Sequence, residues 1–264
     1  MTAVVYTIAS GKGGTGKTTT TVNLGTALSA LGKRVVILDA DIGMANLGLV
    51  MGLEKHAVTL HEVLGGSAKI DDAIYEGAAG VMVAPCGVSL KGFQNSNPER
   101  LKDVMGALVE QFEIMLIDAP AGISKDAVIP MAIADEVILV VNPELSSMAD
   151  ALKTKVLTEM VGGKIKGAIV NRAGMENVDI PKQKVAELLN TRVIGVIPED
   201  PNVRRAAAFK TPLVINTPKS PAAVAYKRIA AQITGATFKE EPENNGKEGF
   251  VEKLAKSLFG GRKK

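Results

Sequence analysis

Short apolar runs recur along the chain and alternate with segments of helical periodicity. The runs are apolar at nearly every position, and most of them end in Pro, Asp or Asn. Continuous apolar runs, unlike alternating ones, indicate burial on both faces and so predict strands of a parallel sheet. The predicted strands are Val4–Ala9, Val35–Asp39, Val81–Pro85, Ile114–Asp118, Val137–Asn142, Ala168–Asn171 and Val193–Pro198.

Helical patterns lie between these runs. Thr18–Leu31 is one, closed by Gly32, and Ser220–Thr234 is another. Asn97–Gln111 is a third; Asn97 is placed to cap it, with proline at its first position. Strands that alternate with helices predict a doubly wound α/β domain with a mostly parallel sheet, and a chain of 264 residues fits one such domain. We expect residues 1–238 to form it.

The composition excludes several kinds of site. Cys86 is the one cysteine, so disulfides within the chain, thiolate metal clusters and CxxC redox sites are excluded. Aromatic residues make up 3%, and the net charge is +3, neither of which is typical of a nucleic-acid binder. No apolar stretch reaches the roughly 18 residues that span a bilayer, and no signal-peptide pattern is present, so we expect a cytosolic protein. We expect a buried thiol at Cys86, and surface or capping roles for His56 and His61.

A glycine-rich segment, GKGGTGKT, joins the first predicted strand to the first predicted helix. It fits the pattern G-x-x-x-x-G-K-[ST], whose backbone N–H groups and helix N-terminus hold phosphate. Lys17 is expected to bridge the β- and γ-phosphates, and the Thr18 hydroxyl to ligate Mg²⁺. The alternative is a glycine-rich turn without a ligand. The predicted nucleotide-binding residues of this loop are Gly11, Lys12, Gly13, Gly14, Thr15, Gly16, Lys17, Thr18 and Thr19.

Three aspartates follow predicted strands and suit the same reaction. Acids at the carboxyl ends of parallel strands lie at the ligand-binding edge of the sheet. Asp118 suits a water-mediated magnesium contact, Asp39 the outer shell of the magnesium, and Asp41 the orientation of the attacking water. This assignment separates Asp39 from Asp41 because side chains alternate if the strand continues. The Gly122 amide is expected to meet the γ-phosphate. The alternative for each acid is a helix cap or a turn residue.

The segments KGGTGKTTT, LDADIGMANL and LIDAPAG together resemble the MinD/ParA family of deviant Walker ATPases, over about Ala3 to Ala236. DADIGMANLGLVMGLE and APAGI are closer to the MinD branch, since ParA members usually have D-x-D-P-Q after the second strand. The resemblance implies a P-loop NTPase fold, ATP hydrolysis with Mg²⁺, and a homodimer that sandwiches ATP. It also implies that Lys12 crosses the dimer interface to the phosphates of the opposite subunit, where a cation stabilises the transition state. The alternative is a solvated loop lysine. Lys12, Lys17 and Asp41 are therefore the predicted catalytic residues.

The same resemblance implies an adenine site. Asn171 and Arg172 match the family's N-R pattern, in which the asparagine binds the base. The segment IPEDPNVRRA after the last predicted strand, around Pro198, Glu199 and Asp200, resembles the second wall of that pocket. The alternative for Asn171 is a turn residue at the end of a strand. A guanine-specific N-K-x-D pattern is not found.

The C-terminal tail changes character after residue 238. Residues 239–249 are polar and predict a flexible linker, and residues 250–264 predict an amphipathic helix with a basic end. The last 16 residues hold five Lys or Arg and one Glu, a side-chain charge of +4. An apolar face with a cationic flank predicts a helix that lies in a membrane interface. The alternatives are a helix packed on its own domain and a docking helix for a protein. The predicted membrane-contacting residues are Phe250, Val251, Leu254, Leu258 and Phe259.

Together these features predict an ATP-dependent switch. One tail binds an anionic membrane weakly, whereas the two tails of an ATP dimer bind in tandem, and hydrolysis releases them. We expect a peripheral protein on the inner face of the cell membrane, with a division inhibitor or a hydrolysis activator as partner. The runner-up is a ParA-like partition ATPase that binds DNA without sequence preference; the net charge of about −1 without the last 16 residues counts against it. A metallocluster carrier or a tail-anchored-protein targeting factor needs paired cysteines.

Overall fold

Residues 2–174 and 179–238 are described here from a computed structural model. The predicted linker and membrane helix lie outside these described residues. Among the described helices, none has the length and apolar character that a bilayer crossing requires.

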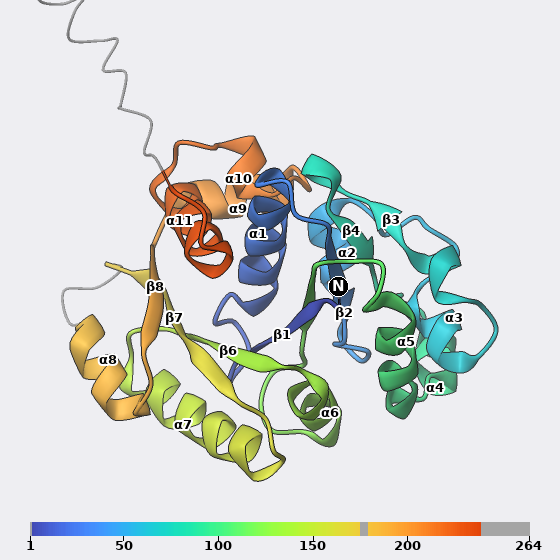
Figure 1. Ribbon diagram of the computed structural model, residues 1–264, viewed down its shortest axis with the longest axis horizontal. Helices are drawn as coiled ribbons and strands as arrows, with labels where there is room; N and C mark the ends of the chain where they lie inside the picture. Colours follow the sequence, from blue (N-terminus) through green and yellow to red (C-terminus); the bar gives the residue numbers. More distant parts are fainter. Residues whose placement is uncertain (1, 175–178, 239–264) are drawn as a thin grey trace, which may run out of the picture.

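One eight-stranded sheet organises the molecule, in the order β3-β4-β2-β5-β1-β6-β7-β8 (Figure 1). Every neighbouring pair is parallel except β3 and β4, which are antiparallel. This confirms the predicted doubly wound α/β class, and all seven predicted strands are present. The two-residue β3 was not predicted, because so short a strand leaves no run of apolar positions. The strands are β1 (Val4–Ala9), β2 (Val35–Asp39), β3 (Tyr75–Glu76), β4 (Met82–Ala84), β5 (Ile114–Asp118), β6 (Glu136–Val141), β7 (Ile165–Ala173) and β8 (Val193–Pro198).

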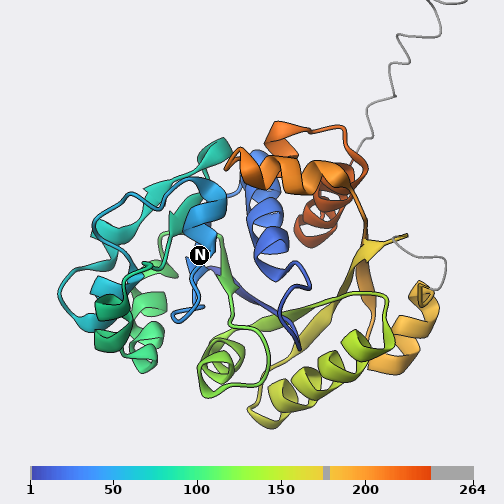
Figure 2. The same ribbon diagram turned by 180° about the vertical axis from the view of Figure 1, so that it is seen from behind.

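Helices cover both faces of this sheet (Figures 1 and 2). One face packs against α1 and α11, while α3, α5, α6, α7 and α8 cover the other face, as the buried clusters show. The α-helices are α1 (Lys17–Ala30), α2 (Leu47–Met51), α3 (Leu60–Gly65), α4 (Leu90–Asn95), α5 (Leu101–Leu108), α6 (Lys125–Ile133), α7 (Leu145–Met160), α8 (Lys182–Leu189), α9 (Pro201–Ala208), α10 (Leu213–Asn216) and α11 (Pro221–Thr234); short 3₁₀ turns are η1 (Ile70–Ala73), η2 (Ala78–Gly80) and η3 (Pro98–Arg100).

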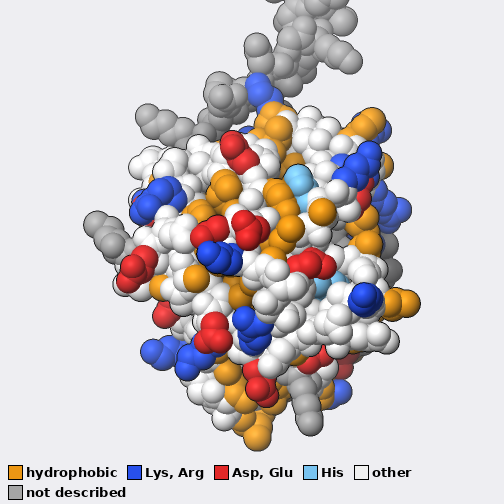
Figure 3. Space-filling model, turned by 90° about the vertical axis from the view of Figure 1, so that its right-hand side faces the viewer, with side chains coloured by type: hydrophobic (Ala, Val, Ile, Leu, Met, Phe, Trp, Pro, Cys, Tyr) orange, Lys and Arg blue, Asp and Glu red, His pale blue; other side chains and the backbone are white. Residues whose placement is uncertain are grey.

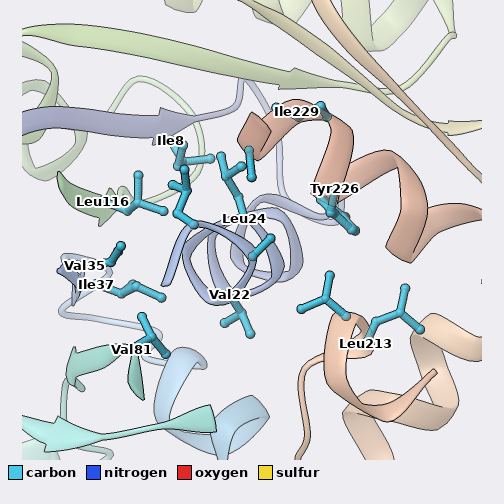
Figure 4. Packing of buried hydrophobic residues seen from close by; sticks show 14 of the residues in the cluster. Ile8, Val22, Leu24, Val35, Ile37, Val81, Leu116, Leu213, Tyr226 and Ile229 are labelled. Carbon is cyan, nitrogen blue, oxygen red and sulfur yellow. The ribbon is translucent and has the colours of Figure 1, made fainter. Parts of the chain in front are cut away.

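Helix α1 is buried on nearly every side. Val22 and Leu24 lie among side chains of the strands and of α11 (Figure 4), and both are fully buried. Asn23 ties the helix to its neighbour α10, because its side-chain oxygen accepts a hydrogen bond of 3.1 Å from the Val214 N–H. The helix that follows the glycine-rich loop is therefore held by the sheet on one side and by the C-terminal helices on the other.

The segment predicted as a helix over Asn97–Gln111 begins as expected but is divided. The Asn97 side chain accepts a hydrogen bond from the Glu99 N–H, and Pro98 begins a 3₁₀ turn. The α-helix α5 then runs only from Leu101 to Leu108. The capping signal was thus correct, whereas the helix ends before Gln111.

Candidate nucleotide-binding site

The glycine-rich loop Gly11–Gly16 connects β1 to α1, as predicted. Gly14 and Gly16 have φ values of 78° and 88°, in the left-handed region that favours glycine. A Cβ on Gly16 would also lie only 2.2 Å from Asn171 Nδ2. At Gly13 and Gly14, by contrast, an added Cβ would meet nothing within 4 Å. The loop is therefore packed against β7 on one side and open on the other, as a phosphate cradle must be.

Three side chains of α1 converge on the carboxylate of Asp118 at the end of β5. Lys17 Nζ lies 3.3 Å from Asp118 Oδ1, and Thr18 Oγ1 donates a hydrogen bond of 2.6 Å to Oδ2. Thr21 Oγ1 donates to Oδ1 at 3.0 Å. Asp118 is 1% exposed and Lys17 is 7% exposed, so this is a buried ion pair with added hydroxyl donors. The structure thus brings together Lys17, Thr18 and Asp118, which the sequence had singled out. Thr21 was missed, although it follows Lys17 by one helical turn.

Asp39 lies beside Asp118 on the neighbouring strand, in register with it. Burial, together with the nearby charge of Asp118, raises the pKa of the Asp39 carboxyl to about 8. Two backbone N–H groups, of Asp41 and Leu47, donate to the Asp39 oxygens at 3.2 Å and favour the ionised form. Burial and the charge of Asp118 outweigh these two hydrogen bonds. A cation bound near Asp39 and Asp118 would lower the pKa of Asp39.

Asp41 lies in the loop after β2, because the strand ends at Asp39. The condition of the prediction, a continuing strand, is therefore not met. The alternation itself was also wrong, because side chains two positions apart point to the same face of a strand. Asp41 Oδ1 accepts a hydrogen bond of 3.1 Å from the Met44 N–H, and this turn shapes the loop. Burial raises the pKa of the Asp41 carboxyl, an effect that the positive charge of Lys17 opposes.

The donor set at this edge of the sheet fits magnesium. Thr18, Asp118 and Asp39 offer oxygen atoms, which Mg²⁺ prefers, and the Thr15 hydroxyl is buried without a partner among the described residues. The described part of the chain has no cluster of three His, Cys, Asp or Glu that could hold a metal ion alone. An Mg²⁺ ion that binds together with a nucleotide commonly takes one or two protein ligands, besides phosphate oxygens and water.

The Gly122 amide, which we expected to meet the γ-phosphate, donates to a backbone carbonyl in this structure. Gly122 has a φ of 84°, and its N–H donates a hydrogen bond of 2.9 Å to the carbonyl of Ser10. The amide is thus already used to join the loop after β5 to the glycine-rich loop. It would have to give up this bond to reach a phosphate.

Lys12 points away from the Asp118 cluster. Its Nζ lies 3.2 Å from Glu144 Oε2 and 3.1 Å from Ser146 Oγ, at the start of α7. The hydrogen bond from Lys12 lowers the pKa of the Glu144 carboxyl. The side chain of Lys12 is one third exposed. The two lysines of the loop therefore face different surroundings, one buried and one at the surface.

A pocket of about 190 Å³ adjoins the glycine-rich loop, beside the Asn171 end of β7. It is lined by all five residues of the predicted adenine site, together with Gly16 and Thr19 of the loop. Val203 and Arg204 of α9 and Tyr226 of α11 complete it. The first two lie in the segment IPEDPNVRRA but were not named as site residues, and Tyr226 was not predicted. The one available signal was Asp200-Pro201, the start of a helix directly after the pocket wall.

The amide of Asn171 has a fixed orientation. Its Nδ2 donates a hydrogen bond of 2.7 Å to the carbonyl of Thr15, which leaves the side-chain oxygen as an acceptor and the second N–H as a donor. The oxygen can accept a hydrogen bond from the exocyclic amino group of adenine.

The acids of the pocket wall differ in role. Glu199 Oε2 lies 2.9 Å from Arg172 Nε, and its other oxygen lies 3.8 Å from Arg204 Nη2. Asp200 caps α9 and accepts hydrogen bonds from Asn202 and from the Ala222 N–H. Burial would raise the pKa of Asp200, but these hydrogen bonds outweigh it and the pKa is lowered. Asp200 therefore supports the wall, whereas Glu199 holds the two arginines.

The histidines differ from expectation in one case. His61 is 2% exposed, and its Nε2 lies 2.9 Å from the carbonyl of Ile42, so the predicted surface or capping position was wrong. Its helix α3 buries this side chain beneath the loop that carries Asp41. His56 is exposed, and its ring stacks on that of Tyr75 with the two ring centroids 3.6 Å apart. Cys86 is buried, as predicted.

Comparisons with known proteins agree with this geometry. A family model, the CobQ/CobB/MinD/ParA nucleotide binding domain, matches residues 6–213. An uncharacterised ATP-binding protein of Methanocaldococcus jannaschii is 52% identical over 98% of each chain. The septum site-determining protein MinD of Pyrococcus horikoshii, solved with Mg-ADP, is 38% identical with a TM-score of 0.85, over 88% of this chain and 96% of that one. MinD of Aquifex aeolicus, solved as a MinC:MinD complex, is 32% identical with a TM-score of 0.80, over 90% and 99%.

Proposed function

The chain belongs to the CobQ/CobB/MinD/ParA family of nucleotide-binding domains, and on this premise we propose that it is an ATPase that acts as a reversible membrane switch. It binds ATP with Mg²⁺, closes into a homodimer, and holds an anionic membrane through its C-terminal helices. Hydrolysis opens the dimer and releases it. The cellular role that we propose is MinD-like placement of the division site or of another protein.

The observation that carries the ATPase assignment is the convergence of Lys17 and Thr18 on Asp118. Phosphoryl transfer needs little covalent chemistry from a protein, and depends on positioned charge around the γ-phosphate. Lys17 supplies a buried cation beside the open glycine cradle, and Thr18 and Asp118 supply oxygens for a magnesium ion. Bound magnesium would neutralise charge on the phosphate oxygens. Asp41, half-buried at the same sheet edge, is placed to orient the water that attacks.

The surface around this edge supports a dimer. Lys12 is one third exposed and pairs with Glu144 at the start of α7, outside its own Asp118 cluster, and in the dimer that we propose it exchanges this partner for the phosphates of the second subunit. Large apolar side chains are exposed in the segments that follow four of the five adjacent strands β4, β2, β5, β1 and β6. Exposed apolar groups gathered at one edge are typical of an interaction surface. They are Met44 after β2, Val88 and Leu90 after β4, Ile123 after β5 and Leu145 after β6.

The membrane part of the proposal rests on the sequence pattern of residues 250–264. Its localisation, on the inner face of the cell membrane, and its partner belong to the same proposal. A division inhibitor or a hydrolysis activator is the proposed protein partner, since MinD of Aquifex aeolicus was solved in a complex with MinC.

Kinetics of phosphate release test the enzymatic part. We expect hydrolysis of Mg-ATP with a specific activity that rises with protein concentration, because the active form is a dimer. Lys12→Ala should bind a fluorescent ATP analogue normally, yet turn over about 100-fold more slowly, the effect of one lost transition-state donor. Lys184→Ala, on the distant helix α8, is the matched control. Normal turnover in Lys12→Ala would contradict its role.

Mixing two inactive variants tests whether Lys12 acts across the interface. Asp41→Asn lacks the water-orienting group of its own site, and Lys12→Ala lacks the lysine that it would lend to the partner. If Lys12 acts in the opposite subunit, the Lys12→Ala subunit of a mixed dimer keeps its own Asp41 and receives Lys12 from the Asp41→Asn subunit, so its site is complete. If Lys12 acts in its own subunit, neither site has both groups. Recovered hydrolysis on mixing therefore supports the proposal, while no recovery would place Lys12 in its own site.

A further inference from the structure

A cavity of about 250 Å³ lies beside the loop that carries Asp41, and the proposed function does not use it. Residues 42–46 of this loop form one wall, while residues 87–90 and Phe93 of α4 form the other. A Cβ on Gly43 would lie 3.6 Å from the Phe93 ring, so the two walls come close at this point. The Asp41 loop and α4 thus form the cavity together.

The rim of this cavity is apolar and exposed. Met44 and Leu90 are 75% and 80% exposed, Val88 is 71% exposed and Phe93 is 45% exposed. Because all four residues line the same cavity, they surround one opening. The face of the molecule that carries α3 and α4 has exposed hydrophobic side chains among positive and negative ones (Figure 3). Apolar groups around a concavity are typical of a binding site for another molecule.

His61 lies at the bottom of the cavity. It lines the cavity, yet it is 2% exposed, unlike the residues of the rim. Its Nε2 lies 2.9 Å from the carbonyl oxygen of Ile42, which can only accept a hydrogen bond, so Nε2 carries the ring proton. Nδ1 of the neutral ring is then an acceptor, and it is buried without a hydrogen-bond partner among the described residues. Such an acceptor is costly to bury, and a ligand that donates to it removes the cost.

Two glycines keep the space beside this nitrogen clear. A Cβ on Gly87, which also lines the cavity, would lie 3.0 Å from His61 Nδ1, and a Cβ on Gly92 would lie 2.8 Å from it. A side chain at either position would therefore cover Nδ1. With glycine at both positions, neither residue shields Nδ1 from a group that enters the cavity.

These features define the chemistry of the occupant. The described residues that line the cavity include no Lys, Arg, Asp or Glu, so they favour an uncharged and largely apolar group. The acceptor at the bottom requires an N–H or O–H on that group. The side chains of Trp and Tyr have both properties, and they are enriched among the residues that anchor protein interfaces.

A second copy of this chain does not supply such a side chain. The sequence has no Trp and three Tyr. Tyr6 and Tyr226 are 5% and 1% exposed, and the Tyr75 hydroxyl donates a hydrogen bond of 2.6 Å to the carbonyl of Val58. The occupant therefore comes from a different protein.

We propose that this cavity is a docking site for a Trp or Tyr side chain of another protein, which donates a hydrogen bond to His61 Nδ1. The Met44 N–H, in the cavity wall, donates to Asp41 Oδ1 at 3.1 Å. A partner seated here therefore contacts the loop that carries the proposed water-orienting residue. This link to hydrolysis rests on the proposed function, whereas the binding site itself does not.

Titration of the full-length protein with N-acetyltryptophanamide, without nucleotide or membrane, tests the site. The comparison probes are its 1-methylindole derivative, which lacks the N–H, and N-acetylphenylalaninamide. The readout is the ¹⁵N NMR signal of the His61 ring, which moves when Nδ1 accepts a hydrogen bond; His56 is the one other histidine. Phe93→Ala removes part of one wall, and Leu188→Ala, a partly exposed apolar residue on α8, is the matched control. Thermal unfolding shows whether both variants fold.

The tryptophan probe should bind the wild type with a Kd on the order of 1 mM and shift the His61 Nδ1 signal. The two comparison probes should bind about 10-fold more weakly, because they leave the acceptor unpaired. Phe93→Ala should bind the tryptophan probe about 5-fold more weakly, and Leu188→Ala should bind it as the wild type does.

An unchanged His61 signal, or equal binding of the 1-methyl probe, would overturn this inference. Equal binding of the phenylalanine probe would overturn it as well, since a Phe of the tail or of a second copy would then fit the cavity. If Phe93→Ala did not fold, the comparison of probes on the wild type would still decide. Because no nucleotide or membrane is present, a failure of ATP hydrolysis or of membrane binding is a separate result, which concerns the proposed function alone.

Discussion

The carboxylate of Asp118 receives three side-chain contacts from a single helix, from Lys17, Thr18 and Thr21. A buried ion pair is costly to desolvate, and it is stable only when hydrogen bonds satisfy the remaining lone pairs. The two threonine hydroxyls provide them here. The Lys17 ammonium and the Asp118 carboxylate are therefore already out of water, and a bound nucleotide and ion could exchange partners with them without a further desolvation cost.

At the same scale, Cys86 gives a prediction that depends on pKa. Burial, and after it the charge of Asp39, raises the pKa of the thiol well above its usual value. A raised thiol pKa keeps the neutral form at pH 8, and only the thiolate reacts with disulfide reagents. We expect labelling of the native protein by Ellman's reagent to be at least about 10-fold slower than labelling of the guanidinium-unfolded chain.

Since Cys86 is the one cysteine, no other thiol contributes to the signal. Labelling of the native protein at the rate of the unfolded chain would show that the thiol is accessible and ionised, against this account.

Single residues were predicted from the sequence where a local motif dictates them. Lys17, Thr18 and Asp118 follow from a loop pattern and from the end of a strand, and the structure brings them together. Arg204 and Tyr226 join the nucleotide pocket from α9 and α11, and belong to no motif. His61 is buried because α3 packs beneath the Asp41 loop, a long-range contact that no local pattern encodes.

At the scale of elements, the approach of α7 to the glycine-rich loop depends on Gly11. A Cβ on Gly11 would lie 2.3 Å from the backbone carbon of Asp150 and 2.7 Å from the Ala151 nitrogen. Gly11→Ala must therefore push α7 away from the loop. We expect it to lower the free energy of unfolding by about 1–3 kcal/mol, as overpacking does.

Gly13→Ala is the matched control, because its Cβ would meet nothing within 4 Å. Its unfolding free energy should stay within about 0.5 kcal/mol of the wild type. Denaturant unfolding curves measure both, and equal curves for the two variants would show that α7 does not press on the loop.

The apolar runs predicted the strands well, because a parallel sheet buries both faces of each strand and leaves continuous apolar stretches. Helices were predicted less completely. Helix α1 lies between the sheet and the C-terminal helices, so its polar residues, such as Asn23, are buried and its pattern is not amphipathic. Short helices such as α2 and α10 depend on tertiary contacts and on their loops, and no periodicity of their own identifies them.

At the scale of the whole molecule, the helices α9, α10 and α11 precede the predicted tail in the chain and lie near the predicted nucleotide pocket. Helix α10 contacts α1 through Asn23, and α9 and α11 line the pocket of about 190 Å³. In the proposed function, a nucleotide in this pocket would contact the helices that precede the tail. The proposed ATP dimer would carry two tails, and the second would bind with little further loss of translational entropy.

The central claim is that ATP, through the dimer, controls binding to a membrane. The direct measurement is sedimentation with phosphatidylglycerol vesicles of the full chain and of a chain that ends at residue 248, each with Mg-ATP and with Mg-ADP. We predict that the full chain sediments with ATP and remains in solution with ADP. The truncated chain should still bind ATP and yet remain in solution with either nucleotide. Equal sedimentation of the truncated chain, or of the full chain with ATP and ADP, would contradict the account.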